Sequence, residues 1–381
     1  MCAGKPDMND LEGILVVSLE QAVAAPYASC KLADAGARVI KIEREDGDFA
    51  RNYDKLVFGQ SSYFVWLNRG KESLCLDVKN ESDNRLLFEI IAKADVFIQN
   101  LAPGAVDRLG LGAKTLTEKF PSLIYCSISG YGETGPYREQ KAYDMLVQGE
   151  SGLISVNGTA EGVARVGISV CDIAAGMTAY AAIMQSLFAR SRTGKGRIIE
   201  VSLFHAIADW MNVPYLQARY GKKPPPRVGV RHPTISPYGA FACSDGKAVL
   251  LSIQNEREWH KLCSDVLGDA ALATDPRYVS NVLRVKNNAE LEKTIGECLK
   301  EFSREDAIAR LSKAGIACGR LSDMQDLMQH PQLRHTSVQS GGADIEVLAP
   351  GAFFPGHEKR STQVPGIGEH STVIRDEFSK S

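Results

Sequence analysis

Short apolar runs alternate with amphipathic stretches through the first half of the chain. Aliphatic residues fill 13–19 and 38–43, which are long enough for strands but too short for buried helices. Between them, residues 24–35 are rich in alanine, with Pro26 where a first helical turn accepts proline and Gly36 where a helix C-cap favours glycine. Because strand–helix–strand units form parallel sheets, this pattern predicts an α/β protein with a Rossmann-like parallel-sheet domain.

The same pattern continues to about residue 220. We predict further strands at 96–99, 123–129 and 198–202, and further helices at 82–93 and 172–190. The turn after the first strand lacks G-x-G-x-x-G, so the fold can be Rossmann-like without binding a dinucleotide.

Composition changes at residues 221–227, where three consecutive prolines form a stiff linker. We therefore place a domain boundary there and predict a large domain over 1–220 and a smaller α+β domain over 221–330. The smaller domain is expected to hold a hairpin, three helical segments and a short strand, at 239–253, 256–267, 288–302, 304–315 and 316–321.

The charge and the cysteine content of the chain exclude several classes of protein. The 381 residues include 44 Lys+Arg and 46 Asp+Glu, a net charge of -2, which argues against a general nucleic-acid binder. No apolar run approaches a bilayer span, and the N-terminus lacks the apolar core of a secretory signal. The nine cysteines form no C-x-x-C pair, so neither a disulfide framework nor a metal site is indicated. We expect a reduced, cytoplasmic protein with no membrane partner.

A glycine-rich turn follows the strand predicted at 123–129. Residues 130–137 contain three glycines and a proline, and Asp144 follows among apolar neighbours where a helix would begin. Open α/β sheets bind ligands just outside the carboxyl ends of their strands, so Asp144 is a candidate nucleophile or base. A helix cap or an ion-pair acid is the alternative for Asp144, and capping is the simplest interpretation of Asp172.

Cations and amides also follow the predicted strands or occupy the loops. If the strands are parallel, these groups meet at one rim, where they would suit phosphates. Ordinary solvated surface positions are the alternative. The residues concerned are Arg44, Arg69, Lys71, Asn100 and Arg108.

An ordered set of short motifs runs along most of the chain, and with it the sequence resembles the class III CoA-transferases, the formyl-CoA:oxalate and carnitine CoA-transferase family. Each motif alone is weak, whereas their order is specific. The motifs are Ala25-Pro26 and the stretches 39–44, 68–71, 95–100, 103–104, 108–110, 127–132, 143–144, 172–176 and 193–196.

The resemblance implies a large domain closed by the C-terminal segment 331–381, and two subunits interlocked as a homodimer. It implies an acyl-CoA and a small carboxylic acid as ligands, with coenzyme A thioester as substrate and no tightly bound cofactor. It assigns the nucleophile to Asp144. The coenzyme A contacts that it implies are Arg44, Lys71, Asn100 and Arg108.

An attacking carboxylate explains how one aspartate would suffice. It would displace the thiolate from a thioester and form a mixed anhydride, which divides one hard transfer into easier steps without a metal or redox group. Backbone N–H groups of the glycine turn are the expected oxyanion donors. Val23 stands where oxalate-type members have glutamine, and their tetraglycine loop is not visible, so both differences count against oxalate as the acceptor.

Other activities stay open at this point. An α-methylacyl-CoA racemase needs two proton-transfer groups and has a histidine before the aspartate, where this chain has Tyr143, a poor base at neutral pH. Asp172 would match the second aspartate of a racemase and is otherwise expected to be structural. A non-catalytic CoA-binding protein would not need Asp144, and a thioesterase would hydrolyse the thioester without an acceptor acid.

The start of the small domain carries the candidates for acyl recognition. Arginine binds carboxylate through two parallel hydrogen bonds, so this stretch would hold a distal carboxylate. Ordinary linker basics are the alternative. We predict a transferase for C4–C5 dicarboxylic acids such as itaconate, mesaconate or citramalate, with succinyl-CoA as a donor. Its predicted substrate-binding residues are Arg227, Arg231, His232 and Thr234.

Overall fold

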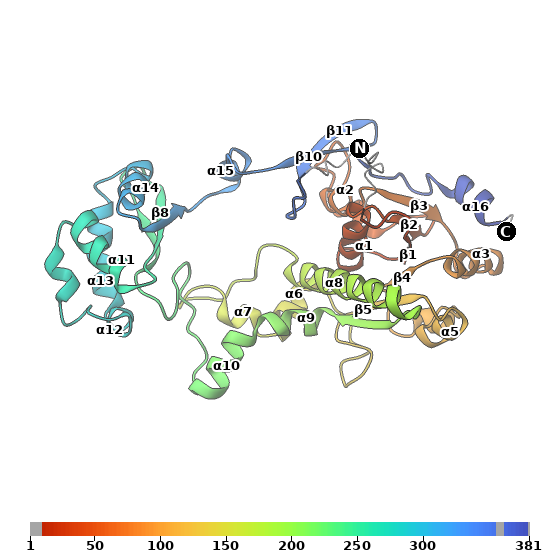
Figure 1. Ribbon diagram of the computed structural model, residues 1–381, viewed down its shortest axis with the longest axis horizontal. Coiled ribbons are helices and arrows are strands. Elements are labelled where there is room, and N and C mark those ends of the chain that lie inside the picture. The colour runs from red at the N-terminus through yellow and green to blue at the C-terminus, as the bar shows by residue number, and fades with distance from the viewer. Residues whose placement is uncertain (1–9, 356–361, 380–381) are drawn as a thin grey trace, which may run out of the picture. The chain divides into compact units, whose positions relative to one another are not determined.

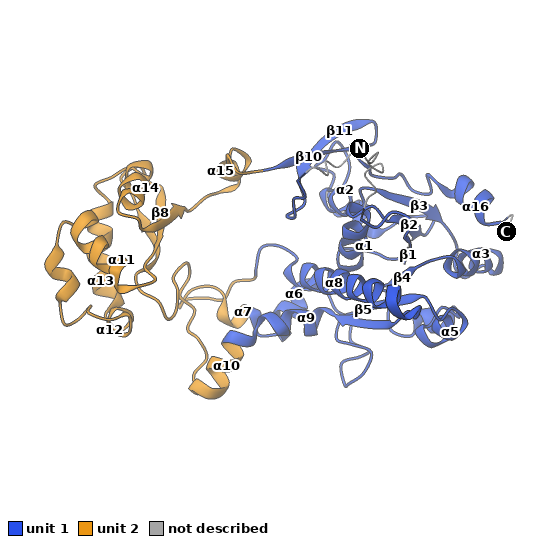
Figure 2. Cartoon of the chain, in the orientation of Figure 1, with its two compact units in different colours: residues 1–153, 166–213, 334–381 blue, residues 154–165, 214–333 orange. Residues whose placement is uncertain are grey.

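The computed structural model describes residues 10–355 and 362–379, and the chain divides into two compact units (Figures 1 and 2). Unit 1 takes the chain up to Leu153, then Val166–Val213, and then the chain from Arg334 on. Unit 2 takes Ile154–Arg165 and Pro214–Leu333. This division differs from the predicted boundaries, because the chain leaves unit 1 twice, first for a short excursion at Ile154–Arg165 and then for the whole of Pro214–Leu333.

The centre of unit 1 is a six-stranded sheet in which all neighbouring strands are parallel, in the order β3-β2-β1-β4-β5-β6. This confirms the predicted α/β fold class. The order reverses between β1 and β4, and such a reversal opens a crevice at the carboxyl ends of the strands. The strands are β1 (Leu15–Leu19), β2 (Arg38–Glu43), β3 (Lys71–Cys75), β4 (Val96–Gln99), β5 (Ile124–Ser129) and β6 (Ile198–Ser202).

Helices cover both faces of this sheet, and β1, β4 and β5 are accordingly mostly apolar. On β1, Val16 packs on the side of α1, α8 and α9, and its neighbour Val17 packs on the side of α3, α5 and α16. The helices of unit 1 are α1 (Ala24–Asp34), α2 (Ser62–Leu67), α3 (Glu81–Ala92), α4 (Ala105–Arg108), α5 (Ala113–Lys119), α6 (Asp144–Glu150), α8 (Val170–Thr193), α9 (Leu203–Trp210) and α16 (Ser371–Ser379).

The long helix α8 packs closely against α1. A Cβ at Gly176 would lie 2.7 Å from the Ala24 carbonyl oxygen, so only glycine permits this approach. Among the described helices, α8 alone has the length and hydropathy to cross a membrane, which the sequence analysis did not anticipate. Its buried small residues, including Ala174 and Ala175, belong to the apolar cluster of the sheet. Apolar residues of α8 therefore contribute to the core of unit 1.

The C-terminal part of the chain also belongs to unit 1. It forms a small sheet of β10 (His335–Ser340), β11 (Ala343–Leu348) and β12 (Thr362–Gln363), where the sequence analysis predicted no strand. Its last helix, α16, is anchored to the edge of the large sheet, because Arg38 on β2 binds both Glu72 and Glu377.

Unit 2 is a smaller α+β body around the antiparallel sheet β7-β8-β9. Its core surrounds Trp259, which is completely buried. The elements that lie in it, or that cross into it from unit 1, are α7 (Leu153–Val156), α10 (Asn212–Gly221), β7 (Tyr238–Ala242), β8 (Ala248–Ser252), α11 (Glu256–Lys261), α12 (Asn281–Lys286), α13 (Asn288–Leu299), α14 (Arg304–Lys313), β9 (Ala317–Arg320) and α15 (Met324–Met328).

Candidate active site

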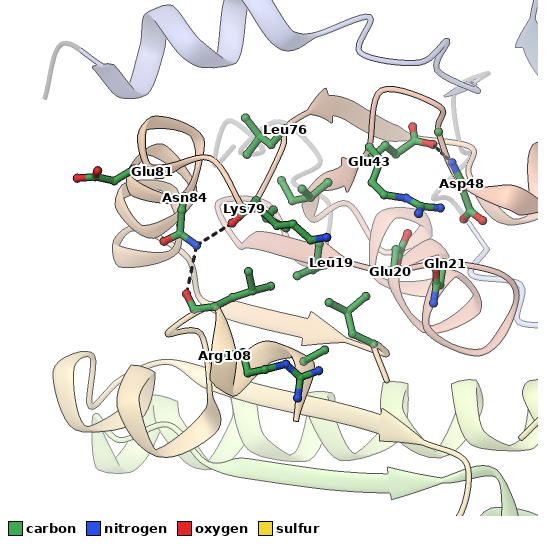
Figure 3. Close-up of a pocket in the computed structure, with 17 residues that line it drawn as sticks. Leu19, Glu20, Gln21, Glu43, Asp48, Leu76, Lys79, Glu81, Asn84 and Arg108 are labelled. Carbon is green, nitrogen blue, oxygen red and sulfur yellow. Dashed lines mark hydrogen bonds between the residues drawn. The ribbon is translucent and has the colours of Figure 1, made fainter. Parts of the chain in front are cut away.

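A cavity of about 690 Å³ lies where the sheet order reverses, at the carboxyl ends of β1, β2 and β4 (Figure 3). Arg44 enters it from the end of β2 and Arg108 from α4, as the sequence analysis predicted for groups at one rim. Lys79, just before α3, contributes a third cation that the sequence analysis missed. Lys79 follows β3, which ends at Cys75.

The acids that line the cavity are each paired within the protein. Glu43 binds Arg51 through both carboxylate oxygens, at 2.9 and 2.7 Å. Asp48 binds Lys41 at 2.8 Å, and Glu81 binds Arg85 at 3.0 Å across one helical turn. The cations of the lining are less engaged: Arg44 is mostly exposed and lies 3.4 Å from Asp46. The cavity therefore presents a surplus of available positive charge, which suits the phosphates of a nucleotide.

Two of the predicted coenzyme A contacts have other partners in the structure. Lys71 is completely buried, and its three N–H groups face Glu20 at 2.7 Å and the oxygens of Pro26 and Asn68 at 3.1 Å. A lysine has only three donors, so Lys71 has none left for a phosphate. Its role is in the framework under the cavity.

Asn100 also faces the protein. Its amide both donates to and accepts from the backbone of Gln21, at 2.8 and 2.9 Å. These bonds join the ends of β4 and β1 and fix Gln21, which lines the cavity. Asn100 therefore shapes the cavity wall through its neighbour. Arg69, the fifth group in the predicted set, binds Asp34 through two bonds away from the cavity lining.

A buried ion network supports the cavity floor. Glu20 accepts bonds from Ser18 and Ser29 at 2.6 Å, besides its pair with Lys71, and Lys41 lies 3.5 Å away. Burial raises the pKa of Glu20, but the nearby lysines outweigh it and hold this pKa at about 2. Glu20 is therefore a permanent anion that fixes the loop after β1.

The glycine turn after β5 allows the Tyr143-Asp144 stretch to approach the sheet. A Cβ at Gly130 would lie 2.2 Å from the Cβ of Ala142, so any other residue would push this stretch away. The Gly132 N–H donates to Ser129 Oγ at 3.0 Å, which removes this amide from the predicted oxyanion donors. Asp144 then begins α6, as the sequence predicted.

Asp144 is held by two hydrogen bonds. Its Oδ1 accepts from the backbone N–H of Cys171, and its Oδ2 accepts from Gln148 Nε2, both at 2.7 Å. Cys171 lies in the first turn of α8, so Asp144 caps that helix from a distance. The structure thus gives Asp144 the capping role that was the alternative to catalysis.

Asp172, the next residue of α8, has a different environment. No described residue donates a hydrogen bond to its carboxylate, although it lies partly buried next to Asp144. Burial, together with the charge of Asp144, raises the pKa of Asp172 to about 7. Pairs of carboxylates with separated pKa values are typical of catalytic sites.

The side chain of Tyr53 lies near Asp172. Tyr53 follows the 3₁₀ helix Phe49–Asn52, and its pKa is raised to about 12 by burial and by both Asp48 and Asp172. Tyr63 packs edge-on against Tyr53 at 5.4 Å. Tyr53 is therefore near both Asp172 and Asp48, and Asp48 lines the cavity.

The four residues predicted to bind the acyl group lie in unit 2, whereas Asp144 lies in unit 1. Arg231 is 47% exposed and pairs with Glu292 at 3.1 Å, and Arg227 donates to the carbonyl oxygen of Thr159 at 2.9 Å. His232 stacks on the ring of Tyr238, and its Nδ1 accepts from the N–H of Thr234 at 3.2 Å. Both arginines thus already have protein partners.

This part of unit 2 is firmly supported. The buried Arg284 donates to the carbonyl oxygen of Ser236 at 2.9 Å, and Asn281 donates to that of Thr234 at 2.9 Å. The predicted substrate-binding loop is therefore an ordered part of unit 2.

No cluster of three or more histidine, cysteine, aspartate or glutamate side chains suitable for a metal ion occurs in the part of the chain that the structure describes. Cys30 and Cys171 are among the described cysteines that are free thiols.

The cationic cavity lies at the strand ends of a parallel sheet, a position typical of α/β enzymes that bind phosphate-bearing ligands. A family model described as CoA-transferase family III matches residues 11–371. The chain belongs to this family, and it is a CoA-transferase.

The relatives are named for different carboxylic acids. An acetyl-CoA:oxalate CoA-transferase from Acetobacter aceti is 36% identical, over 97% of this chain and 95% of the relative. The human succinyl-CoA:glutarate CoA-transferase is 32% identical, over 98% and 88%. The crystal structure of a CAIB/BAIF family protein from Brucella suis has a TM-score of 0.85 and 33% identity, covering 96% of this chain and 98% of that one.

Proposed function

We propose that the protein moves coenzyme A from a short dicarboxylyl-CoA to a C4–C5 dicarboxylic acid through an aspartyl-acyl anhydride. The nucleotide end of the thioester lies in the cavity, where Arg44, Lys79 and Arg108 neutralise its phosphates. The thioester end extends past Tyr53 toward the carboxylate pair. The observation that carries this proposal is the carboxylate of Asp172, which accepts no hydrogen bond from the described residues and lies near Asp144.

The environments of the two aspartates favour Asp172 as the attacking group. Asp144, which the sequence analysis named as nucleophile, has both oxygens engaged by donors, and these bonds reduce its readiness to attack. Asp172 has no such bonds, and its pKa is raised from its ordinary value to about 7. We therefore assign the anhydride to Asp172, with Asp144 as its neighbour.

The reaction balances without a cofactor. An oxygen of Asp172 attacks the thioester carbonyl, and the thiolate leaves with the electron pair of the C–S bond. The thiolate then attacks the aspartyl carbonyl, which releases the donor acid and leaves an enzyme thioester. The acceptor carboxylate attacks that thioester, and the returning thiolate takes the new acyl group and frees Asp172.

Dicarboxylic acids are favoured by two lines of support. Several relatives are named for the dicarboxylates oxalate, glutarate and mesaconate, and a relative of 28% identity is named for the monocarboxylate (R)-2-hydroxy-4-methylpentanoate. In unit 2, Arg231 is partly exposed and can exchange Glu292 for a distal carboxylate, with His232 and Thr234 nearby. Val23 still argues against oxalate, although an oxalate enzyme is among the relatives.

A transfer screen tests the proposal. Purified enzyme is given acetyl-CoA or succinyl-CoA with isotope-labelled oxalate, succinate, glutarate, mesaconate, itaconate or citramalate, and new CoA esters are quantified by mass spectrometry. We expect the highest kcat/KM for a C4–C5 acceptor with succinyl-CoA. Preference for oxalate would reject the acid class, and hydrolysis without acceptor would indicate a thioesterase.

A homodimer is part of the proposal as well. Large apolar side chains of unit 1, such as Phe188 and Trp210, are more than half exposed in the single chain, which a second copy would explain. Sedimentation equilibrium should give twice the mass of one 41.4 kDa chain. A monomer at micromolar concentration would reject this part.

A further inference from the structure

Gln148 is a buried amide that bonds both to Asp144 and to the segment that leads into α8. It is completely buried on α6, one turn after Asp144. Its Nε2 donates to Asp144 Oδ2 at 2.7 Å and lies 3.3 and 3.4 Å from the carbonyl oxygens of Val166 and Ile168. Its Oε1 accepts the N–H of Val166 at 2.9 Å. Both ends of the amide are therefore used.

These bonds join two elements that carry the two aspartates. Asp144 and Gln148 belong to α6, whereas Val166 and Ile168 lead directly into α8, which carries Asp172. The second oxygen of Asp144 completes the connection through the N–H of Cys171. The start of α8 is thus attached to α6 at three places, all of them within six residues of Asp172.

We infer that Gln148 is a positioning residue that fixes Asp144 on the N-terminus of α8 and so sets where Asp172 meets the thioester. This inference rests on the proposed function, which by itself gives Gln148 no role. An amide is needed at this position, because the site demands a donor toward Asp144 and an acceptor toward Val166. A carboxylate would place like charges together, and an apolar side chain would leave both partners unbonded.

The groups that face Asp172 define what should change. Asp144 approaches from α6, the thiol of Cys171 precedes Asp172 on α8, and Tyr53 follows the 3₁₀ helix Phe49–Asn52. With Gln148 replaced, Asp144 loses one of the two bonds that hold it beside α8, and the repulsion between the like charges moves Asp144 away from Asp172. Its repulsion of Asp172 then weakens, so Asp172 should ionise at lower pH.

The test compares Gln148→Met with wild type and with Ser186→Ala. Methionine keeps the volume and removes the hydrogen bonds, and Ser186→Ala removes a buried bond elsewhere on α8, from Oγ to the Ala182 carbonyl oxygen at 2.8 Å. For Gln148→Met we expect kcat to fall roughly 10²-fold, because small misplacements of a reacting group have effects of that size. KM for the CoA ester should stay within about twofold, and the acid limb of kcat/KM should move to lower pH. Ser186→Ala should retain both kinetic properties.

The outcomes separate the inference from the proposed function. If Gln148→Met keeps kcat within about twofold and keeps the acid limb in place while Asp172→Ala is inactive, Gln148 only supports folding and the inference is wrong. If Asp172→Ala is active, the proposed function fails first. Should Gln148→Met not fold, Gln148→Glu has nearly the same shape and is expected to lose still more activity; an unchanged kcat and pH profile in that variant would reject the inference too.

Discussion

Unit 1 contains two acids, Glu20 and Asp172, whose surroundings shift their pKa values in opposite directions. Glu20 meets a lysine and two hydroxyl donors, and its pKa falls to about 2. No described residue donates a hydrogen bond to the Asp172 carboxylate, and with burial and the nearby charge of Asp144 its pKa rises to about 7. The comparison shows that burial alone does not identify a reactive acid. A buried acid with all its partners is framework, and one without them is available for chemistry.

The largest expected effect comes from removing the unpaired acid. Asp172→Ala should reduce kcat by roughly 10⁴-fold or more, the scale found when a nucleophile is deleted. Asp144→Ala should have a smaller effect, on the order of 10²-fold, because it displaces Asp172 without removing it. Initial rates of CoA transfer at saturating substrate measure both. A larger loss of kcat in Asp144→Ala than in Asp172→Ala would identify Asp144 as the nucleophile and contradict the assignment to Asp172.

Breaking the ion pair between Lys71 and Glu20 should lower the stability of the fold more than the rate of CoA transfer. Lys71→Met leaves Glu20 as a buried anion with fewer partners, and removal of one member of a buried ion pair typically costs about 3–5 kcal/mol. Urea denaturation followed by circular dichroism measures this loss. An exposed control, Lys114→Met, removes only a surface contact at 3.9 Å from Glu118 and should change stability by less than about 0.5 kcal/mol. Equal effects of the two variants would contradict the framework role.

The pH dependence of the two groups should also differ. Asp172 must be ionised to attack, so kcat/KM should rise with pH and level off above about 7. Asp144→Asn removes the neighbouring charge and should shift this limb to lower pH. The lowered pKa of Glu20 stabilises the fold above its ordinary value of 4.5, and this stability is lost as pH falls toward 2. An acid limb that stays in place in Asp144→Asn would show that the two carboxylates do not interact.

The cavity cations should act on binding alone. Lys79→Ala and Arg108→Ala should each raise KM for acyl-CoA by roughly 5- to 10-fold, about 1 kcal/mol for an ion pair at an accessible site, with kcat nearly unchanged. Dephospho- and intact CoA esters, compared in the same assay, show which phosphate each cation meets. A fall in kcat with KM unchanged would place these residues at the reacting end.

The smallest effect is expected in unit 2. Arg231→Ala should raise KM for a dicarboxylate acceptor by about threefold, because the guanidinium is partly exposed and already paired with Glu292. A monocarboxylate acceptor of equal length should show no change. If both acceptors respond equally, Arg231 has a structural role only.

Much of the fold was predictable because its signals are local. The runs at β2 and β6 gave the observed strand limits, and the helices α1, α3 and α8 follow directly from their periodicity and end signals. The sheet of β10 and β11 was missed, because its residues alternate weakly between buried and exposed and include many polar side chains.

The site was less predictable, because its chemistry depends on partners that are distant in sequence. Arg44 and Arg108 were found from their positions after strands, but nothing local shows that Lys71 would meet Glu20, 51 residues earlier. In the same way, Asp144 and Asp172 are both acids at helix starts, and only their bonds separate them.

Trapping the acylated enzyme tests the central claim most directly. The enzyme is mixed with succinyl-CoA and quenched with hydroxylamine, which converts an activated aspartyl group to a hydroxamate, and peptides are analysed by mass spectrometry. The account predicts modification at Asp172 and none in Asp172→Ala. Modification at Asp144 alone, or at neither residue during rapid turnover, would contradict it.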